Sequence, residues 1–303
     1  MVPFVVQKML IITGLLLPLI SAQAEQRARQ RKADIYTQPV AGNIYVLRGV
    51  KGGNVGLFIG EDGTFMIDDQ FASRTDSIQA AIQAAGGRSP DYLLNTHYHG
   101  DNTGGNQHFG KAGALIVSHD NVRKKLNSGF FIKVFNKQQE PEAKIALPII
   151  TFSNSISFHL NGDTVYVFHV PNAHTDGDVV IQFKAANVIH TGDIFFNGFY
   201  PFIDVYHGGS LKGMIDAVDR ILTLTNIDTR IIPGHGPLAD EALLKNYRAM
   251  LVKAYAQLKK LKDAGTSVQE AVAKKPLADL ELQWGNGIYS GAEWIRQVYP
   301  SIK

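Results

Sequence analysis

Four separate segments of this chain each combine a short β-type run with a loop that carries histidine or aspartate. The segments are Leu93 to Asp101, Phe168 to His174, Val188 to Asp193 and Ile231 to Gly236. Loops at strand ends commonly carry functional residues on a rigid scaffold. Strand ends of one sheet system can converge in space although they lie far apart in the sequence. We therefore predict a fold that brings these four strand ends together.

The polar side chains at these strand ends are of the types that bind zinc. The candidate metal ligands are His97, His99, Asp101, His174, Asp193 and His235. Imidazole and carboxylate together suit Zn²⁺, and a site without thiolate is more typical of catalytic than of structural zinc. A single His-x-His or Gly-His-Gly is common by chance, so the specificity lies in the whole set. The sequence predicts one or two metal ions per chain.

The spacing of apolar residues predicts strands followed by helices, and this order occurs twice. Between Ile35 and Asp69 the runs are of β type, and helical spacing follows from Ser73 to Ala85. A second β-rich block from Ile149 to Phe196 precedes two helices, which Ser210 and Asp240 are expected to cap. The prediction is an α/β fold of two similar halves, packed sheet to sheet with the helices outside.

The two ends of the chain suggest export and a packed C-terminus. Residues 1–24 have the pattern of a secretory signal peptide, because Lys8 precedes an apolar run and Ala22-Gln23-Ala24 offers a small-x-small cleavage site. We expect a periplasmic or secreted protein without stable membrane insertion, and an uncleaved N-terminal anchor is the alternative. Residues 25–303 are expected to form a single domain. The aromatic-containing segment at about 266–303 is expected to pack as a C-terminal cover.

The composition limits the partners that this chain can bind. Its formal net charge of +3 offers no electrostatic footprint for nucleic acid. The basic cluster from Arg27 to Lys32 is expected to be a solvated tail. The chain has no cysteine, so an ordinary hydrophobic core must stabilise it. A small-molecule substrate is the expected partner, and the oligomeric state stays open.

The motifs together resemble the metallo-β-lactamase superfamily. Thr96-His97-Tyr98-His99-Gly100-Asp101 is followed by Ala173-His174-Thr175, Thr191-Gly192-Asp193 and Pro233-Gly234-His235-Gly236. The resemblance covers Ile35 to about Leu258. It implies a four-layer αββα sandwich with a dinuclear metal centre between the two sheets.

The resemblance also implies a role for each candidate ligand. His97, His99 and His174 would hold the first zinc ion. Asp101, Asp193 and His235 would hold the second ion, with Asp193 as a possible bridge. Asp68, or its neighbour Asp69, stands where the family keeps an aspartate that orients the ligands from behind.

One position departs from the pattern of most hydrolases in this superfamily. Members resembling glyoxalase II or the lactonases have a histidine directly after the motif aspartate, and Asn102 stands there in this chain. Asparagine is a poor zinc ligand, so the occupancy of the second site is in doubt and a mononuclear form is an alternative. The β-lactamases that lack this histidine have a cysteine where Asp193 stands. The ligand set of this chain is therefore intermediate between these two groups of enzymes.

The resemblance implies a hydrolase in which a metal-bound hydroxide attacks a carbonyl carbon, with Asp101 as the catalytic residue that orients it. The expected substrate is a cyclic or activated amide or ester, with a β-lactam as the leading single candidate. Lactone or thioester hydrolysis is the hydrolytic alternative. Alternatives from other classes are a mononuclear iron oxidoreductase of the persulfide dioxygenase type and a metal-binding module without catalysis.

Aromatic side chains near the ligands are candidates for an apolar lip around the substrate. They are Phe131, Phe196, Phe199 and Tyr200, and each could equally belong to the core. In β-lactamases with a cysteine at the second zinc, a lysine shortly after it usually grips the substrate carboxylate. The corresponding stretch from Ile194 to Asn197 has no cation, which weakens the case for β-lactams. His190 is expected to be a buried, hydrogen-bonded residue rather than a ligand.

Overall fold

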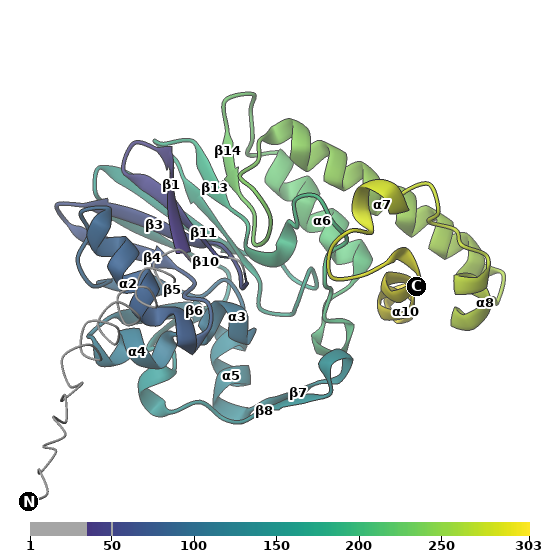
Figure 1. The fold of residues 1–303 in the computed structure, drawn as a ribbon, viewed down its shortest axis with the longest axis horizontal. Coiled ribbons are helices and arrows are strands. Elements are labelled where there is room, and N and C mark those ends of the chain that lie inside the picture. The colour runs from purple at the N-terminus through teal and green to yellow at the C-terminus, as the bar shows by residue number, and fades with distance from the viewer. Residues whose placement is uncertain (1–34, 50) are drawn as a thin grey trace, which may run out of the picture.

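The computed structural model describes residues 35–49 and 51–303 (Figure 1). The expected signal peptide at 1–24, its cleavage site and the basic cluster at 27–32 lie outside the described residues, so export stays a prediction. Within the described ranges, no helix is long and apolar enough to cross a membrane.

Seven strands form a mixed sheet in the first half of the chain, in the spatial order β1-β2-β3-β4-β5-β6-β9. The strands are β1 (Ile35–Ala41), β2 (Ile44–Gly49), β3 (Val55–Gly60), β4 (Gly63–Ile67), β5 (Tyr92–Leu94), β6 (Leu115–His119) and β9 (Ile150–Phe152). The first four strands pair antiparallel, whereas β4, β5, β6 and β9 pair parallel and need helical crossovers. The carboxyl ends of β4 and β5 therefore lie at one edge, and Asp68 and His97 follow them.

Five strands form the second sheet, in the order β10-β11-β12-β13-β14. They are β10 (Ser155–Leu160), β11 (Asp163–His169), β12 (Val179–Phe183), β13 (Val188–His190) and β14 (Arg230–Ile232). β12 is antiparallel to β11 and to β13, and β14 is parallel to β13. Because β11, β13 and β14 consequently run in the same direction, their carboxyl ends share one edge. The loops with His174, Asp193 and His235 begin at that edge.

Helices lie on the outer faces of the two sheets (Figure 1). On the first sheet they are α2 (Thr75–Ala84), α4 (Asn106–Lys111) and α5 (Asp120–Ser128), whereas the short α3 (Gly100–Thr103) contains Asp101 and lies at the edge where the strands end. On the second they are α6 (Leu211–Leu222) and α7 (Glu241–Asp263). The Ser210 side chain accepts from the Gly213 N–H and that of Asp240 accepts from the Leu243 N–H, so the predicted residues cap α6 and α7.

Apolar side chains from both sheets meet in a buried layer between them. The layer includes Ile44, Val46, Phe58, Phe65 and Ile67 from the first sheet and Val165, Val167, Val179, Ile181 and Phe183 from the second. Alternation along β12 sends Ile181 into this layer and Val180 towards the helices α6 and α7. The order of layers is helix, sheet, sheet, helix. This confirms the predicted αββα sandwich.

Two further units lie outside the four layers. A two-stranded hairpin, β7 (Phe130–Ile132) and β8 (Lys137–Gln139), follows α5 and runs along the lower edge in Figure 1. The C-terminal segment contains α8 (Val268–Ala273), α9 (Glu281–Trp284) and α10 (Gly291–Val298). Its four aromatic side chains Trp284, Tyr289, Trp294 and Tyr299 are all buried in the same apolar cluster as α6 and α7.

Candidate metal centre

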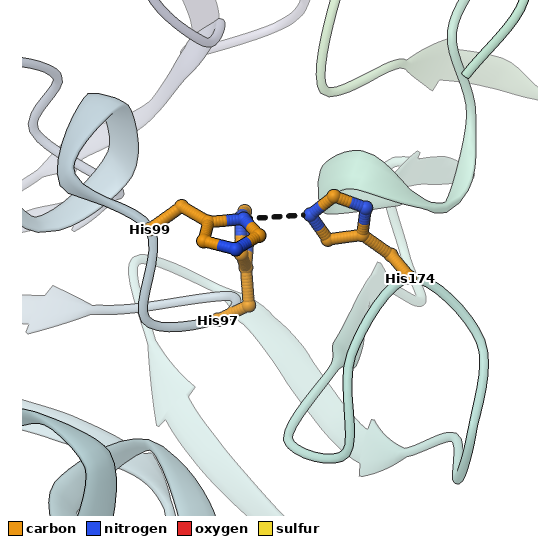
Figure 2. A group of neighbouring side chains, drawn as sticks. All are labelled: His97, His99 and His174. Atoms are coloured by element: carbon orange, nitrogen blue, oxygen red, sulfur yellow. Dashed lines mark hydrogen bonds between the residues drawn. The ribbon is translucent and has the colours of Figure 1, made fainter. Parts of the chain in front are cut away.

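The six predicted ligands form two neighbouring groups at the edge where the strands end. The first group is His97, His99 and His174, and the second is Asp101, Asp193 and His235. Within each group the candidate ligand atoms lie within 4.8 Å of one another. Figure 2 shows the three imidazoles of the first group turned towards one another from two separate loops. The structure thus brings together all six residues that the sequence analysis selected.

Hydrogen bonds behind the first group fix which nitrogens of two imidazoles carry protons. Nε2 of His99 lies 3.1 Å from the carboxylate Oδ2 of Asp204, and Nδ1 of His174 lies 2.8 Å from the carbonyl oxygen of Phe202. Both oxygens are acceptors, so these nitrogens donate. The opposite nitrogens, Nδ1 of His99 and Nε2 of His174, therefore carry lone pairs. They face each other at 2.9 Å, along the dashed line in Figure 2.

The third imidazole has its tautomer fixed in the same way. The Thr96 hydroxyl donates to Oδ2 of Asp68 over 2.7 Å and lies 3.0 Å from Nδ1 of His97. The hydroxyl hydrogen is used, so His97 Nδ1 donates and its Nε2 carries a lone pair. That Nε2 is buried without a hydrogen-bond partner. Three buried lone pairs converging on one point fit a metal cation, because buried polar atoms otherwise find donors.

The second group is built around the carboxylate of Asp193. Its Oδ2 lies 3.3 Å from Nε2 of His235, 3.6 Å from Nε2 of His174 and 3.8 Å from Nε2 of His97, so it faces both groups. Oδ2 of Asp101 lies 3.4 Å from Nε2 of His235. Burial alone would lower the pKa of His235, but the Asp193 and Asp101 carboxylates outweigh it and raise this pKa to about 10. This position therefore attracts a cation strongly.

The comparison with known families decides the identity of the fold. A family model described as the metallo-beta-lactamase superfamily matches residues 48–235. This range is more than half of the chain and includes all six candidate ligands. The chain belongs to the metallo-β-lactamase superfamily. The resemblance that the motifs predicted is thereby confirmed.

Solved structures of metallo-β-lactamases share this fold. The metallo-β-lactamase from Pontibacter korlensis superposes with a TM-score of 0.58 at 16% identity, covering 72% of this chain and 99% of that chain. The DIM-1 metallo-β-lactamase has a TM-score of 0.57 at 17% identity, covering 73% and 98%. DIM-1 exposed to ceftazidime has a TM-score of 0.58 at 17% identity and the same coverage. At such identities the likeness shows the fold alone.

Asn102, where many members of the superfamily have a histidine, supports Asp68. Its Nδ2 donates to Oδ2 of Asp68 over 2.9 Å. Asp68 also accepts from the N–H and the hydroxyl of Thr96, each over 2.7 Å. Burial is the main cause that raises the pKa of Asp68 to about 7. The second group consequently keeps three candidate protein ligands, and the Asn102 amide acts from behind them.

Asp68 rather than Asp69 reaches the ligands, and the backbone explains why. Asp68 has a φ of 60°, in the left-handed region that side-chain-bearing residues rarely adopt. This turn at the end of β4 aims its carboxylate at Thr96, and through Thr96 at His97. Asp69 instead accepts from the N–H of Gly105 over 2.8 Å.

Asp204 is a supporting residue that the sequence analysis did not select. Its Oδ2 accepts from the Tyr98 hydroxyl at 2.9 Å, from Nε2 of His99 at 3.1 Å and from Nδ1 of His207 at 2.8 Å. Burial alone would raise the pKa of Asp204, but the hydrogen bonds from His207 and His99 hold it well below its usual range. An ionised carboxylate behind His99 fixes the tautomer and the ring orientation of a candidate metal ligand.

Residues 200–204, which we call the strap, connect the metal ligands with the C-terminal segment. The carbonyl of Phe202 and the carboxylate of Asp204 face the ligand imidazoles. The carbonyl of Pro201 accepts from Nε1 of Trp294 over 2.7 Å, and the carbonyl of Ile203 accepts from Nε2 of Gln297. Phe202 and Asp204 therefore face the metal site, whereas Pro201 and Ile203 are held by helix α10.

The predicted aromatic lip is only partly correct. Phe196 lines the cavity beside the ligands and stacks on His235, with ring centroids 4.8 Å apart. Phe199 packs against Phe196 without lining the cavity. Tyr200 is fully buried and stacks on Trp294.

Phe131 is also corrected by the structure. Side chains alternate along β7, so Phe130 and Ile132 are buried whereas Phe131 is 45% exposed on the opposite face. The apolar residues that line the cavity together with Phe196 are Phe71, Ile132, Phe135, Phe202 and Ile288.

His190 is buried and hydrogen-bonded, and it lies outside both ligand groups. Its Nδ1 accepts from the Gly192 N–H over 3.1 Å, and its Nε2 lies 3.3 Å from the carbonyl oxygen of Asn54. Burial is the main cause that lowers its pKa from 6.5 to about 4. Folded protein therefore keeps His190 neutral at a pH where the unfolded chain binds a proton.

This difference in pKa between the folded and the unfolded state predicts that His190 makes the fold less stable in acid. Above pH 6.5 the neutral His190 does not reduce the free energy of unfolding. As the pH falls from 6.5 towards about 4, the free energy of unfolding drops by about 3 kcal/mol. Urea unfolding at a series of pH values measures the loss. The His190→Gln variant keeps a donor and an acceptor and should lose clearly less stability on acidification. Equal losses in the two proteins would contradict the assignment.

Proposed function

We propose that this chain is a zinc-dependent hydrolase of a cyclic or activated amide or ester, and that a β-lactam is the first substrate to test. The observation that carries the proposal is the convergence of three imidazole lone pairs next to Asp101, Asp193 and His235. Membership of a superfamily whose members are generally hydrolases supports the reaction class. Nitrogen and oxygen donors without thiolate support catalytic zinc.

Each of the two groups of candidate ligands would hold one metal ion. His97, His99 and His174 would hold one ion, and Asp101, Asp193 and His235 would hold a second ion. When bound, zinc lowers the pKa of water to near neutrality and polarises a carbonyl oxygen. Asp193 faces both groups and favours a shared centre over two independent sites.

Asp101 is the residue best placed to move a proton. Its side chain is 26% exposed, against 4% for Asp193, and it lines the cavity. A carboxylate in this position can take a proton from an attacking water molecule and pass it to the leaving nitrogen or oxygen. Phe196 and Phe202 form apolar walls beside it and limit the access of bulk water.

Removal of the metal is the experiment that tests the proposal. We expect purified protein to contain one or two zinc ions per chain and to hydrolyse nitrocefin or a nitrophenyl ester. Hydrolysis should stop on chelation and return when zinc is added. Metal analysis with turnover assays measures both properties. Iron as the bound metal, without turnover of either substrate, would contradict the proposal and favour the mononuclear iron oxidoreductase.

A further inference from the structure

The cavity beside the metal ligands has a defined size and mainly apolar walls. Its volume is about 310 Å³, at the small end of ligand pockets. Asp101, Asp193 and His235 form one side. Ile132 and Phe135, from the β7–β8 hairpin, and Ile288, from the C-terminal segment, contribute apolar surface. Such walls suit a substrate of modest size with an apolar body.

One cation also lines this cavity, and the register of the hairpin explains its position. Ile132 pairs directly with Lys137 across the β7–β8 ladder. Directly paired residues of an antiparallel ladder lie on the same face, and Ile132 is buried at the cavity. The tight turn between them passes through Asn136, which has a φ of 47°. Lys137 therefore belongs to the same wall as Ile132.

The charge of Lys137 is open to a ligand. Among the described residues that line the cavity, it is the one lysine or arginine. Within the described part of the chain, the lysine and arginine ion pairs involve other side chains. Lys133, in the turn of the same hairpin, lies over the Tyr206 ring at 4.5 Å and does not line the cavity. Asp101 and Asp193 are occupied with His235.

We propose that Lys137 binds a carboxylate of the substrate while Ile132, Phe135 and Ile288 hold its apolar body. The substrate class is then an apolar carboxylate that carries a hydrolysable amide or ester. This inference rests on the proposed function, which supplies the hydrolysis of the amide or ester bond. It adds which substrates the cavity selects. The stretch from Ile194 to Asn197 has no cation, so Lys137 supplies a positive charge from a different segment of the fold.

The test measures binding to the metal-loaded protein and needs no turnover. The probes are 4-phenylbutanoate and 4-phenylbutanamide, which share an apolar body and differ in charge. We expect Lys137→Ala to weaken binding of the carboxylate by about three- to fivefold, as for a solvent-accessible ion pair, and to leave the amide unaffected. Lys137→Arg and the matched control Lys133→Ala should bind both probes like the unsubstituted protein. Titration calorimetry gives the affinities.

Three results would overturn the assignment of Lys137. Unchanged carboxylate binding in Lys137→Ala would mean that the metal alone holds the anion. An equal loss for both probes would mean that the lysine stem acts by apolar contact. Equal affinities for the two probes in the unsubstituted protein would remove the selectivity itself. Absence of hydrolysis would count against the proposed function and would leave these binding results intact.

Discussion

Replacement of Asp101 by alanine is expected to lower kcat by about 10²- to 10⁴-fold, the range that a positioned general acid or base contributes. The side chain is the most exposed carboxylate of the metal centre and lines the substrate cavity. Alanine removes both the proton carrier and one ligand of the second group. The three histidines of the first group keep their hydrogen bonds to Thr96, Asp204 and Phe202.

Steady-state kinetics and zinc analysis of the same samples separate these two effects. Asp101→Asn keeps the size of the side chain and loses its ability to carry a proton, so its kcat should also fall. Asp216→Ala is the matched control, because Asp216 is an exposed aspartate on α6 that pairs with Lys212. It should retain full activity. A fully active Asp101→Ala enzyme would refute the role of Asp101.

Replacement of Asp204 by alanine is expected to weaken zinc binding about 10- to 100-fold and to destabilise the fold by about 3 kcal/mol. The substitution leaves two buried donors, on Tyr98 and His99, and a partly buried donor on His207 without their shared acceptor. The His99 ring then loses the hydrogen bond that holds its Nδ1 towards the metal. Both effects have the same cause, so they should appear in one variant.

Competition with a chromophoric chelator measures the zinc affinity, and urea unfolding in excess chelator measures the stability. His207→Ala is the control, because it removes one donor and leaves the bond between Asp204 and His99 in place. Its zinc affinity should stay within about twofold of the unsubstituted protein, because the metal ligands keep their partners. An Asp204→Ala protein with normal zinc affinity would show that the carboxylate has no part in positioning His99.

The ligands and the sandwich could be predicted because local signals mark them. The predicted β-rich block from Ile149 to Phe196 contains strands β9 to β13, and the predicted caps Ser210 and Asp240 begin α6 and α7. Each ligand follows a short β run. Hydrophobic periodicity and capping act over a few residues, so the sequence alone reveals them.

Asp204 could not be predicted, because its partners are distant in sequence. Tyr98 is 106 residues away and His99 is 105 residues away. The prediction that Phe131 belongs to the aromatic lip was wrong for a related reason. Strand β7 has three residues, too few for a period of two to show which face Phe131 occupies. The register that places Lys137 at the cavity is a tertiary property as well.

The strap has a consequence for the order in which the metal site can mature during synthesis. The range that matches the family ends at His235, and by then all six candidate ligands have been made. Trp294 and Gln297, which bind the other side of the strap, lie 93 and 94 residues beyond their partners Pro201 and Ile203. A nascent chain therefore has all six candidate ligands before α10 can hold the strap behind them. High-affinity metal capture should wait until α10 has docked.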